Sequence, residues 1–318
     1  MAQVITVGIG LVFLCVVFWQ INPLFFSQRN IDNLSRQIVP ILLVGIAQSY
    51  VLITGNIDLS IGSVAGMSCM ISATLMAAGY NPWLSIVFTL ACCLCIGWLN
   101  GVLVARCKLP PFIATLGTMT IARGIAQIAN NNYNTDYIGD SSQTFRDMFY
   151  YGKSLSVFNP VWLALILWLV FNFILSRTRT GRHIYAIGSN VEASRLSGVN
   201  VAHTTNIAYL VSAFCSAVVG LYFTATTGMG AMDSGNMYEL YAVAAAVIGG
   251  VSTLGGQGLL LGTIIGASIW AVLQNGLQFA KAPVAIQNIV VGAIVIISVL
   301  LDVILRNGMF SKKRKTVV

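Results

Sequence analysis

Residues 59–105 read LSIGSVAGMSCMISATLMAAGYNPWLSIVFTLACCLCIGWLNGVLVA, a run of 47 positions without Asp, Glu, Lys or Arg. A helix that crosses a hydrocarbon core of about 30 Å needs about 20 mostly apolar residues. The run is therefore long enough for two such helices. Because the turn-forming stretch Tyr80-Asn81-Pro82-Trp83 divides it, we predict two membrane-spanning helices joined by a tight connection.

The rest of the chain repeats this pattern. Residues 1–28, 37–57 and 240–280 also lack charge, and the polar, glycine-rich stretch 252–257 divides the last of them. Only 8% of the 318 residues are charged, against roughly 25% in soluble domains. Since a soluble protein of this length would need a charged surface, we predict an all-α polytopic membrane protein in which residues 1–318 form one domain. Ten spans are expected, centred near residues 13, 46, 70, 95, 121, 168, 216, 246, 268 and 296.

The orientation follows from Lys and Arg, which collect in cytoplasmic loops. Ten spans put both termini on one side, and with the termini inside, eleven of the seventeen basic residues fall on inner segments. The eleven are Arg106, Lys108, Arg177, Arg179, Arg182, Arg195, Arg306, Lys312, Lys313, Arg314 and Lys315. We therefore predict a multi-pass membrane protein with both termini in the cytoplasm. The basic tail, 306–318, suits contact with anionic membrane lipid, and we expect no binding to nucleic acid.

Two segments are polar enough to stand clear of the bilayer, 130–159 on the outer side and 177–205 on the inner side. In the inner one, Asn190 suits a helix N-cap, Glu192 the positive end of a helix dipole, and Gly198 the residue after a helix. This pattern predicts a short helix outside the membrane that is too small to fold alone. The residues themselves leave two roles open, docking on a partner protein and lying on the lipid headgroups.

Four stretches carry a resemblance to a known family. They are the segment from Gly188 to Val199, Gly55 to Ser63, Phe112 to Gly117, and Tyr238-Glu239-Leu240 with the glycines at 249–250 and 255–258. In their order along the chain they resemble the ribose-type monosaccharide permeases of ABC importers, and the likeness runs from about Phe26 to Leu301. One position departs from the pattern, because Tyr241 stands where the family usually has Asp.

The resemblance implies a transmembrane permease subunit of the bacterial plasma (inner) membrane that forms the path of an ATP-driven importer of a pentose or hexose. It implies three protein partners: ABC ATPase subunits, a second permease subunit that is the same chain or a close relative, and a soluble sugar-binding protein. The ATPase subunits would dock on the inner segment 177–205. The coupling residues would be Asn190, Glu192, Ala193, Arg195, Leu196 and Gly198.

Asp58 is the most informative single residue for the translocation path. A carboxylate between two apolar runs, near Asn56 and Ser60, has a high free energy in contact with lipid, so it must face protein, water or a helix end. Asp58 with Ser60 suits the start of a helix, where an anion meets unpaired N–H groups. A structural role at that helix start and a role in the pathway or its gating both stay open for these three residues.

Three further polar residues fall within predicted spans. Arg123 should pair with a carboxylate or with carbonyl groups, or line a water-filled cavity, because contact between its charge and lipid has a high free energy. Asn275 and Gln278 are three residues apart and share a helix face. Such a face can bind sugar hydroxyls or join two helices.

Two other classes of protein compete with the importer. An ion-coupled secondary transporter of a small polar solute normally needs several buried ionisable residues, and the spans offer chiefly Asp58 and Arg123. A membrane enzyme would need a catalytic motif, and we find none. The sequence also lacks a Gly-x-x-x-x-Gly-Lys-Ser/Thr loop, so a partner subunit would hydrolyse the ATP. We therefore expect no catalytic residue, metal site or cofactor.

Overall fold

Helices form most of the chain in the structure, a computed structural model that describes residues 2–306. Each of the ten predicted span centres lies in a different apolar helix, which confirms the all-α class. These helices are α1 (Ala2–Ile21), α2 (Gln28–Ile53), α3 (Ile61–Ala77), α4 (Pro82–Ala105), α5 (Pro111–Ala129), α7 (Asn159–Arg177), α10 (Val201–Thr227), α11 (Tyr238–Ile248), α12 (Leu260–Phe279) and α13 (Val284–Arg306).

The ten helices are unequal in length. Among residues 2–306, six are long and apolar enough to cross a membrane, namely α2, α4, α5, α7, α10 and α12. By contrast, α11 has only 11 residues and is about 16 Å long. The non-helical segment 228–237 precedes it, and 54–60 similarly precedes the short α3. The ten predicted helices are therefore all present, but they differ in length, and six of those described meet the length and hydropathy of a membrane span.

The two short helices begin beside each other. Gly62, in the first turn of α3, lies so close to Gly235 and Glu239 that a Cβ atom there would overlap the Gly235 carbonyl and the Glu239 carboxylate. Non-helical backbone at membrane depth is tolerated where protein rather than lipid surrounds it. The contact between these first turns therefore explains how 54–60 and 228–237 can interrupt an otherwise helical bundle.

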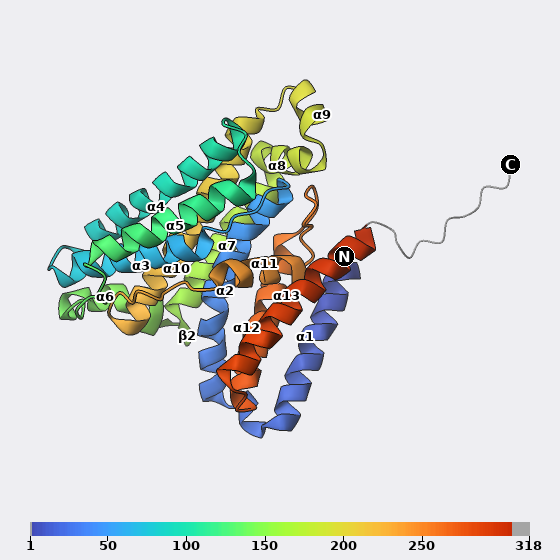
Figure 1. Cartoon of the computed structure of the whole chain (residues 1–318). Coiled ribbons are helices and arrows are strands. Elements are labelled where there is room, and N and C mark those ends of the chain that lie inside the picture. Colours follow the sequence, from blue (N-terminus) through green and yellow to red (C-terminus); the bar gives the residue numbers. More distant parts are fainter. Residues whose placement is uncertain (1, 307–318) are drawn as a thin grey trace.

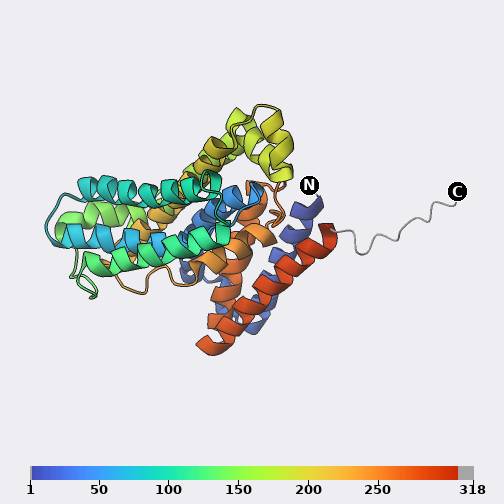
Figure 2. The same ribbon diagram turned by 45° about the horizontal axis from the view of Figure 1, so that its top comes forward.

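The helices pack in two groups, which Figures 1 and 2 show from two directions. One group holds α3, α4, α5 and α10, and the other holds α1, α2, α11, α12 and α13, with α2 packed against α10 between them. Small residues permit close approach within each group. On α12, for example, Gly266 lies directly against the Ala245 carbonyl of α11.

The predicted outer segment folds over the end where α2 begins and α10 ends. It contains η2 (Asp140–Ser142), α6 (Gln143–Arg146), the π-helical η3 (Asp147–Tyr151) and a hairpin of β1 (Lys153–Ser154) and β2 (Val157–Phe158). The Lys153 ammonium lies 2.9 Å from the Asp32 carboxylate of α2, close to η1 (Pro23–Phe26). Two backbone bonds, from Thr135 N–H to Gly230 (3.0 Å) and from Ile138 N–H to Gly228 (2.9 Å), tie the segment to 228–230.

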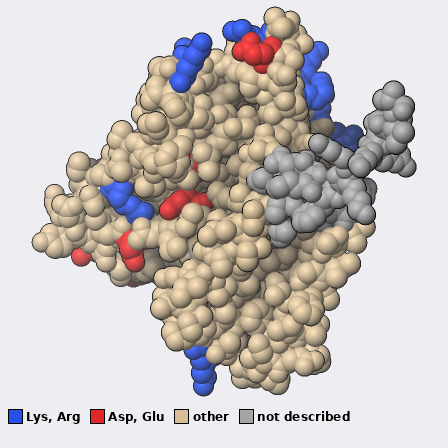
Figure 3. Space-filling view, turned by 45° about the vertical axis from the view of Figure 1, so that its right-hand side comes forward, with Lys and Arg blue, Asp and Glu red and all other residues tan. Residues whose placement is uncertain are grey.

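At the other end, α8 (Arg179–Ser189) and α9 (Val191–Leu196) project from the bundle, with α9 at the top of Figure 1. Charged side chains on the face drawn in Figure 3 collect at its two ends and in one group between them, while the rest of that face is uncharged. This distribution is that of a protein surrounded by lipid. Of the basic tail predicted at 306–318, only Arg306 lies within the described residues.

Candidate functional site at the α8–α9 end

The helix α9 begins and ends where the sequence predicts. The Asn190 Oδ1 atom accepts a hydrogen bond from the Ala193 N–H (2.9 Å), which is the geometry of a side-chain N-cap. Gly198 follows the helix with a left-handed φ of 83°, as expected for a glycine after a helix end. The predicted caps are therefore confirmed, and they fix the direction in which α9 points.

Four exposed residues of α9, which we call the tip, are Val191, Glu192, Arg195 and Leu196. Leu196 is 85% exposed and Val191 is 44% exposed, although both are apolar. Glu192 and Arg195 form an ion pair with an N–O distance of 2.8 Å, and both side chains stay largely in solvent. An exposed pair of this kind contributes little to stability. The tip therefore combines bare apolar groups with a charge pair that is available for other contacts.

The helix α8 fixes α9 to the bundle. Its Ile184 and Ile187 side chains are buried, and Gly188 lies against the Ile53 carbonyl and the Gly256 N–H. The Gly256 N–H donates to the Ile53 carbonyl at 2.8 Å. We call this meeting point of Ile53, Gly188 and Gly256 the junction. It joins the end of α2, the end of α8 and the loop between α11 and α12.

A second bond supports the junction. The Tyr185 hydroxyl donates to the Gly258 carbonyl at 2.6 Å, and burial raises the pKa of that phenol, so it remains a donor. Sequence reasoning did not predict α8 or the junction. The signal for α8 was the spacing of Ile184 and Ile187 behind an arginine-rich start, which is amphipathic at helical period. No local signal identifies the contact of Gly188 with residues so distant in the sequence.

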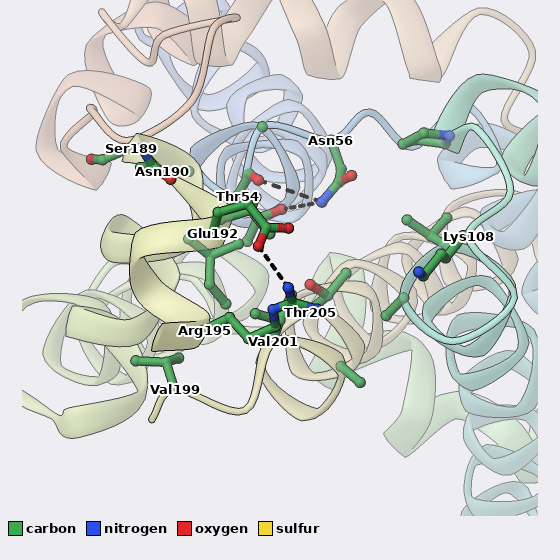
Figure 4. Close-up of a pocket in the computed structure, with 18 of the residues that line it drawn as sticks. Thr54, Asn56, Lys108, Ser189, Asn190, Glu192, Arg195, Val199, Val201 and Thr205 are labelled. Atoms are coloured by element: carbon green, nitrogen blue, oxygen red, sulfur yellow. Dashed lines mark hydrogen bonds and ion pairs between the residues drawn. The ribbon is translucent and has the colours of Figure 1, made fainter. Parts of the chain in front are cut away.

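A cavity of about 1000 Å³ opens beside the junction (Figure 4). Its walls come from the end of α4, the start of α5, the 54–56 turn, α8, α9 and the start of α10. Asn56, predicted for the path, lies on this wall and donates from Nδ2 to Thr54 Oγ1 at 2.8 Å. Lys108 and the Glu192–Arg195 pair also line it. The segments that the sequence assigns to the inner side thus meet around one opening.

Asp58 is buried behind this cavity and accepts hydrogen bonds from three donors. Its Oδ1 atom accepts from the Ser60 N–H (2.9 Å) and the Ser60 hydroxyl (2.6 Å), and its Oδ2 atom accepts from the Ser212 hydroxyl (2.6 Å). Because the Ser60 N–H belongs to the start of α3, the carboxylate satisfies one of the free donors at that end. This arrangement supports the structural alternative for Asp58 and Ser60.

The hydrogen bonds continue from Ser60 into two other helices. The Asn100 Nδ2 atom of α4 donates to Ser60 Oγ at 3.0 Å, and Thr118 of α5 donates to Asn100 Oδ1 at 2.6 Å. We call Asp58, Ser60, Asn100, Thr118 and Ser212 the buried network. All five side chains are at most 2% exposed. The sequence singled out only Asp58 and Ser60, because a lone Asn, Thr or Ser in an apolar helix carries no clear signal.

Arg123 pairs mainly with backbone carbonyls, one of the arrangements expected from its sequence. Its Nη1 atom donates to the carbonyls of Met232 (3.2 Å) and Ser234 (3.0 Å), and its Nη2 atom donates to Asn236 Oδ1 (3.0 Å). The side chain therefore holds the 228–237 segment against α5. Arg123 lies far from the α9 tip, so the predicted coupling and path residues do not form one cluster.

Asn275 and Gln278, which the sequence places on one helix face, lie in different surroundings in the structure. Asn275 is buried and exchanges two hydrogen bonds with Asn30 at 2.9 and 3.0 Å, which joins α12 to the start of α2. Gln278 is exposed. The three-residue spacing is near one turn but does not equal it, so one side chain turns toward the neighbouring helix and the other away. For Asn275 the contacts match the helix-joining alternative.

Comparison with known proteins agrees with this architecture. The family model described as "branched-chain amino acid transport system / permease component" matches residues 30–299. The chain is 36% identical over 295 residues to the ribose import permease protein RbsC of Haemophilus influenzae, which covers 92% of this chain and 91% of the relative. No solved structure matches.

Two further relatives carry other substrate names. The chain is 32% identical over 299 residues to the D-allose transport system permease protein AlsC of Escherichia coli, covering 92% of this chain and 89% of the relative. It is also 32% identical over 284 residues to the fructose import permease protein FrcC of Rhizobium meliloti, covering 87% and 79%. Similarity to each of these three proteins extends over most of both chains.

Proposed function

The chain belongs to the permease family whose model it matches, and from this premise we propose that it forms the membrane path of an ATP-driven, binding-protein-dependent importer of a monosaccharide. The three relatives named above act on ribose, allose and fructose according to their names, and these are all small neutral sugars. A neutral, hydroxyl-rich solute needs few charges along its path. The sparse charge within the spans is consistent with such a solute.

The observation that carries the proposal is the contrast within the α8–α9 end. Leu196 and Val191 of the tip are exposed, whereas at the junction α8 packs closely against the backbone of Ile53 and Gly256. A short helix that is fixed at its base and has an exposed apolar face is suited to bind another protein and to transmit its movement. The proposed partner is an ABC ATPase subunit that contacts Asn190, Glu192, Ala193, Arg195, Leu196 and Gly198.

The proposed assembly has further components. Two permease subunits, either two copies or one copy with a close relative, would enclose the path, and a soluble sugar-binding protein would deliver the sugar to the outer segment 130–159. The termini and the α9 tip would face the cytoplasm of a bacterial cell, as the distribution of Lys and Arg favours. Residues 1–318 would act as one membrane domain.

In the proposed mechanism, the α9 tip moves when the ATPase subunits close. The junction transmits that movement to the end of α2 and to the 54–60 connection, because Gly188 is in direct contact with Ile53. Asn56 lies on the cavity wall at that connection, and the buried network fixes the start of α3 next to it. These residues would therefore form the inner gate, with Arg123 holding the 228–237 segment on the path side.

The test is transport by the complete complex, purified from its host and placed in vesicles with its ATPase and binding protein. ATP-dependent uptake of D-ribose, D-allose or D-fructose is expected, with no uptake of L-leucine. Uptake of L-leucine instead would support an amino-acid solute, in line with the family description. Uptake driven by a proton or sodium gradient without ATP would support an ion-coupled transporter.

A further inference from the structure

A second, smaller hollow of about 250 Å³ lies between the last turn of α10, the 228–237 segment and the start of α11. It is lined by Phe223, Thr227, Asp233, Ser234, Asn236 and Tyr238, among others. Ligand pockets for drug-sized molecules usually measure about 300–1000 Å³. A hollow just below that range fits a ligand of about the size of one monosaccharide.

The lining combines the two kinds of group that bind sugars. Phe223 and Tyr238 pack edge to face with their ring centres 5.0 Å apart, which presents aromatic carbon to the hollow. The C–H faces of a sugar ring pack on such aromatic surfaces. Asp233, Thr227 and Asn236 are exposed, and their oxygen atoms can accept hydrogen bonds from hydroxyl groups.

The polar wall of the hollow is held in place from behind. Arg123 donates to the Ser234 carbonyl at 3.0 Å and to Asn236 Oδ1 at 3.0 Å, and its charge interacts with those of Asp233 and Glu239. Charged groups within a membrane bundle face protein or water rather than lipid. The hollow is therefore on a surface that stays wet or covered in the assembled transporter.

We propose that this hollow is a contact site for one monosaccharide within the membrane path, with the ring on Phe223 and Tyr238 and its hydroxyls bonded to Asp233 and Asn236. The inference rests on the proposed function and adds the residues that contact the solute. Neither the sequence analysis nor the coupling argument assigned a role to Asp233 or Phe223. The site lies apart from the α9 tip, so it can be altered without touching the coupling surface.

The test uses the complete complex in vesicles and the probe that the wild type imports fastest among D-ribose, D-allose and D-fructose. The variant is Asp233→Ala, and the control is Gln20→Ala, which removes an exposed polar side chain at the end of α1, outside both the hollow and the 130–159 segment. With saturating binding protein, the maximal uptake rate should fall about tenfold in Asp233→Ala, since a hydrogen bond to a charged group is lost. The control should stay within about twofold of the wild type.

A second measurement separates a sugar contact from a general defect. The wild type should discriminate the probe from one or more of its monodeoxy analogues, and Asp233→Ala should lose much of that discrimination at the hydroxyl it binds. Unchanged uptake, or equal slowing of the probe and every analogue, would overturn the contact site while leaving the importer proposal intact. If the wild type imports none of the three sugars with ATP, the proposed function fails and the contact site falls with it.

Discussion

The junction and the α9 tip lie within a few residues of each other, yet they are opposite kinds of surface. At the junction, Gly188 has no room even for a Cβ atom, and Ile184 and Ile187 are buried. At the tip, Leu196 is 85% exposed. The difference shows that the chain completes its own packing around α8 but leaves α9 incomplete. A surface left incomplete on a fixed base is where we expect a second protein to bind.

The largest effect on stability should come from filling the junction. In Gly188→Leu the new side chain would overlap the backbone of Ile53 and Gly256, and no change of rotamer relieves a clash with backbone. We expect a loss of about 3 kcal/mol or more, at the upper end for overpacked sites. Thermal unfolding of the detergent-purified chain measures it. A variant that unfolds at the wild-type temperature would show that the junction is loose.

The next effect should come from the buried network. Asp58→Ala leaves the Ser60 and Ser212 hydroxyls without their acceptor in a dry environment, at a cost of about 1–3 kcal/mol. Asp58→Asn keeps an acceptor oxygen and should lose less. Thermal unfolding again separates the two variants. If Asp58→Ala were as stable as the wild type but inactive in uptake, the role of Asp58 would be in gating rather than in structure.

A smaller effect is expected at Gly198, which follows the end of α9. A Cβ atom there meets open space, so only the left-handed φ of 83° opposes a side chain. Gly198→Ala should therefore lose about 1 kcal/mol. A much larger drop in the unfolding temperature would mean that the end of α9 is packed. Wild-type stability with lost ATP-driven uptake would instead place a partner protein against this glycine.

The smallest effect on stability, with a large effect on transport, should come from the tip itself. Leu196→Asp should change the unfolding free energy by no more than about 0.5 kcal/mol, because an exposed side chain loses no contacts. ATP-driven uptake should nevertheless be lost, because a charge would enter the docking surface. Leu24→Asp is the matched control, since Leu24 is 64% exposed in η1, outside both the tip and the 130–159 segment. Equal loss of uptake in both variants would contradict a specific role for the tip.

The sequence predicted those features of the fold that depend on nearby residues. The ten apolar helices follow from the length of uncharged runs, and the caps of α9 follow from Asn190 and Gly198 within a few positions. The shortness of α3 and α11 was not predictable from hydropathy. The 54–60 and 228–237 segments that precede these helices are partly buried by contacts with distant parts of the chain, so their composition does not show where the helices begin.

The site was predicted only in part for the same reason. Arg123 was expected to find carbonyl or carboxylate partners, but the 228–237 segment that supplies them is distant in the sequence. The junction depends on three backbone segments that meet only in the folded chain. Asn275 could be assigned to a helix face but not to Asn30, its partner on another helix. Contacts of this kind need the three-dimensional arrangement.

The most direct test of the account asks what the tip touches. Leu196→Cys and Leu155→Cys would be treated with a short thiol-reactive cross-linker in membranes that contain the complete complex, with the unaltered chain and its native cysteines as background. We predict a covalent product with the ATPase subunit from position 196 and none from position 155. Cross-linking to the ATPase from 155, or labelling of Cys at 196 by a membrane-impermeant reagent from outside intact cells, would contradict the central claim.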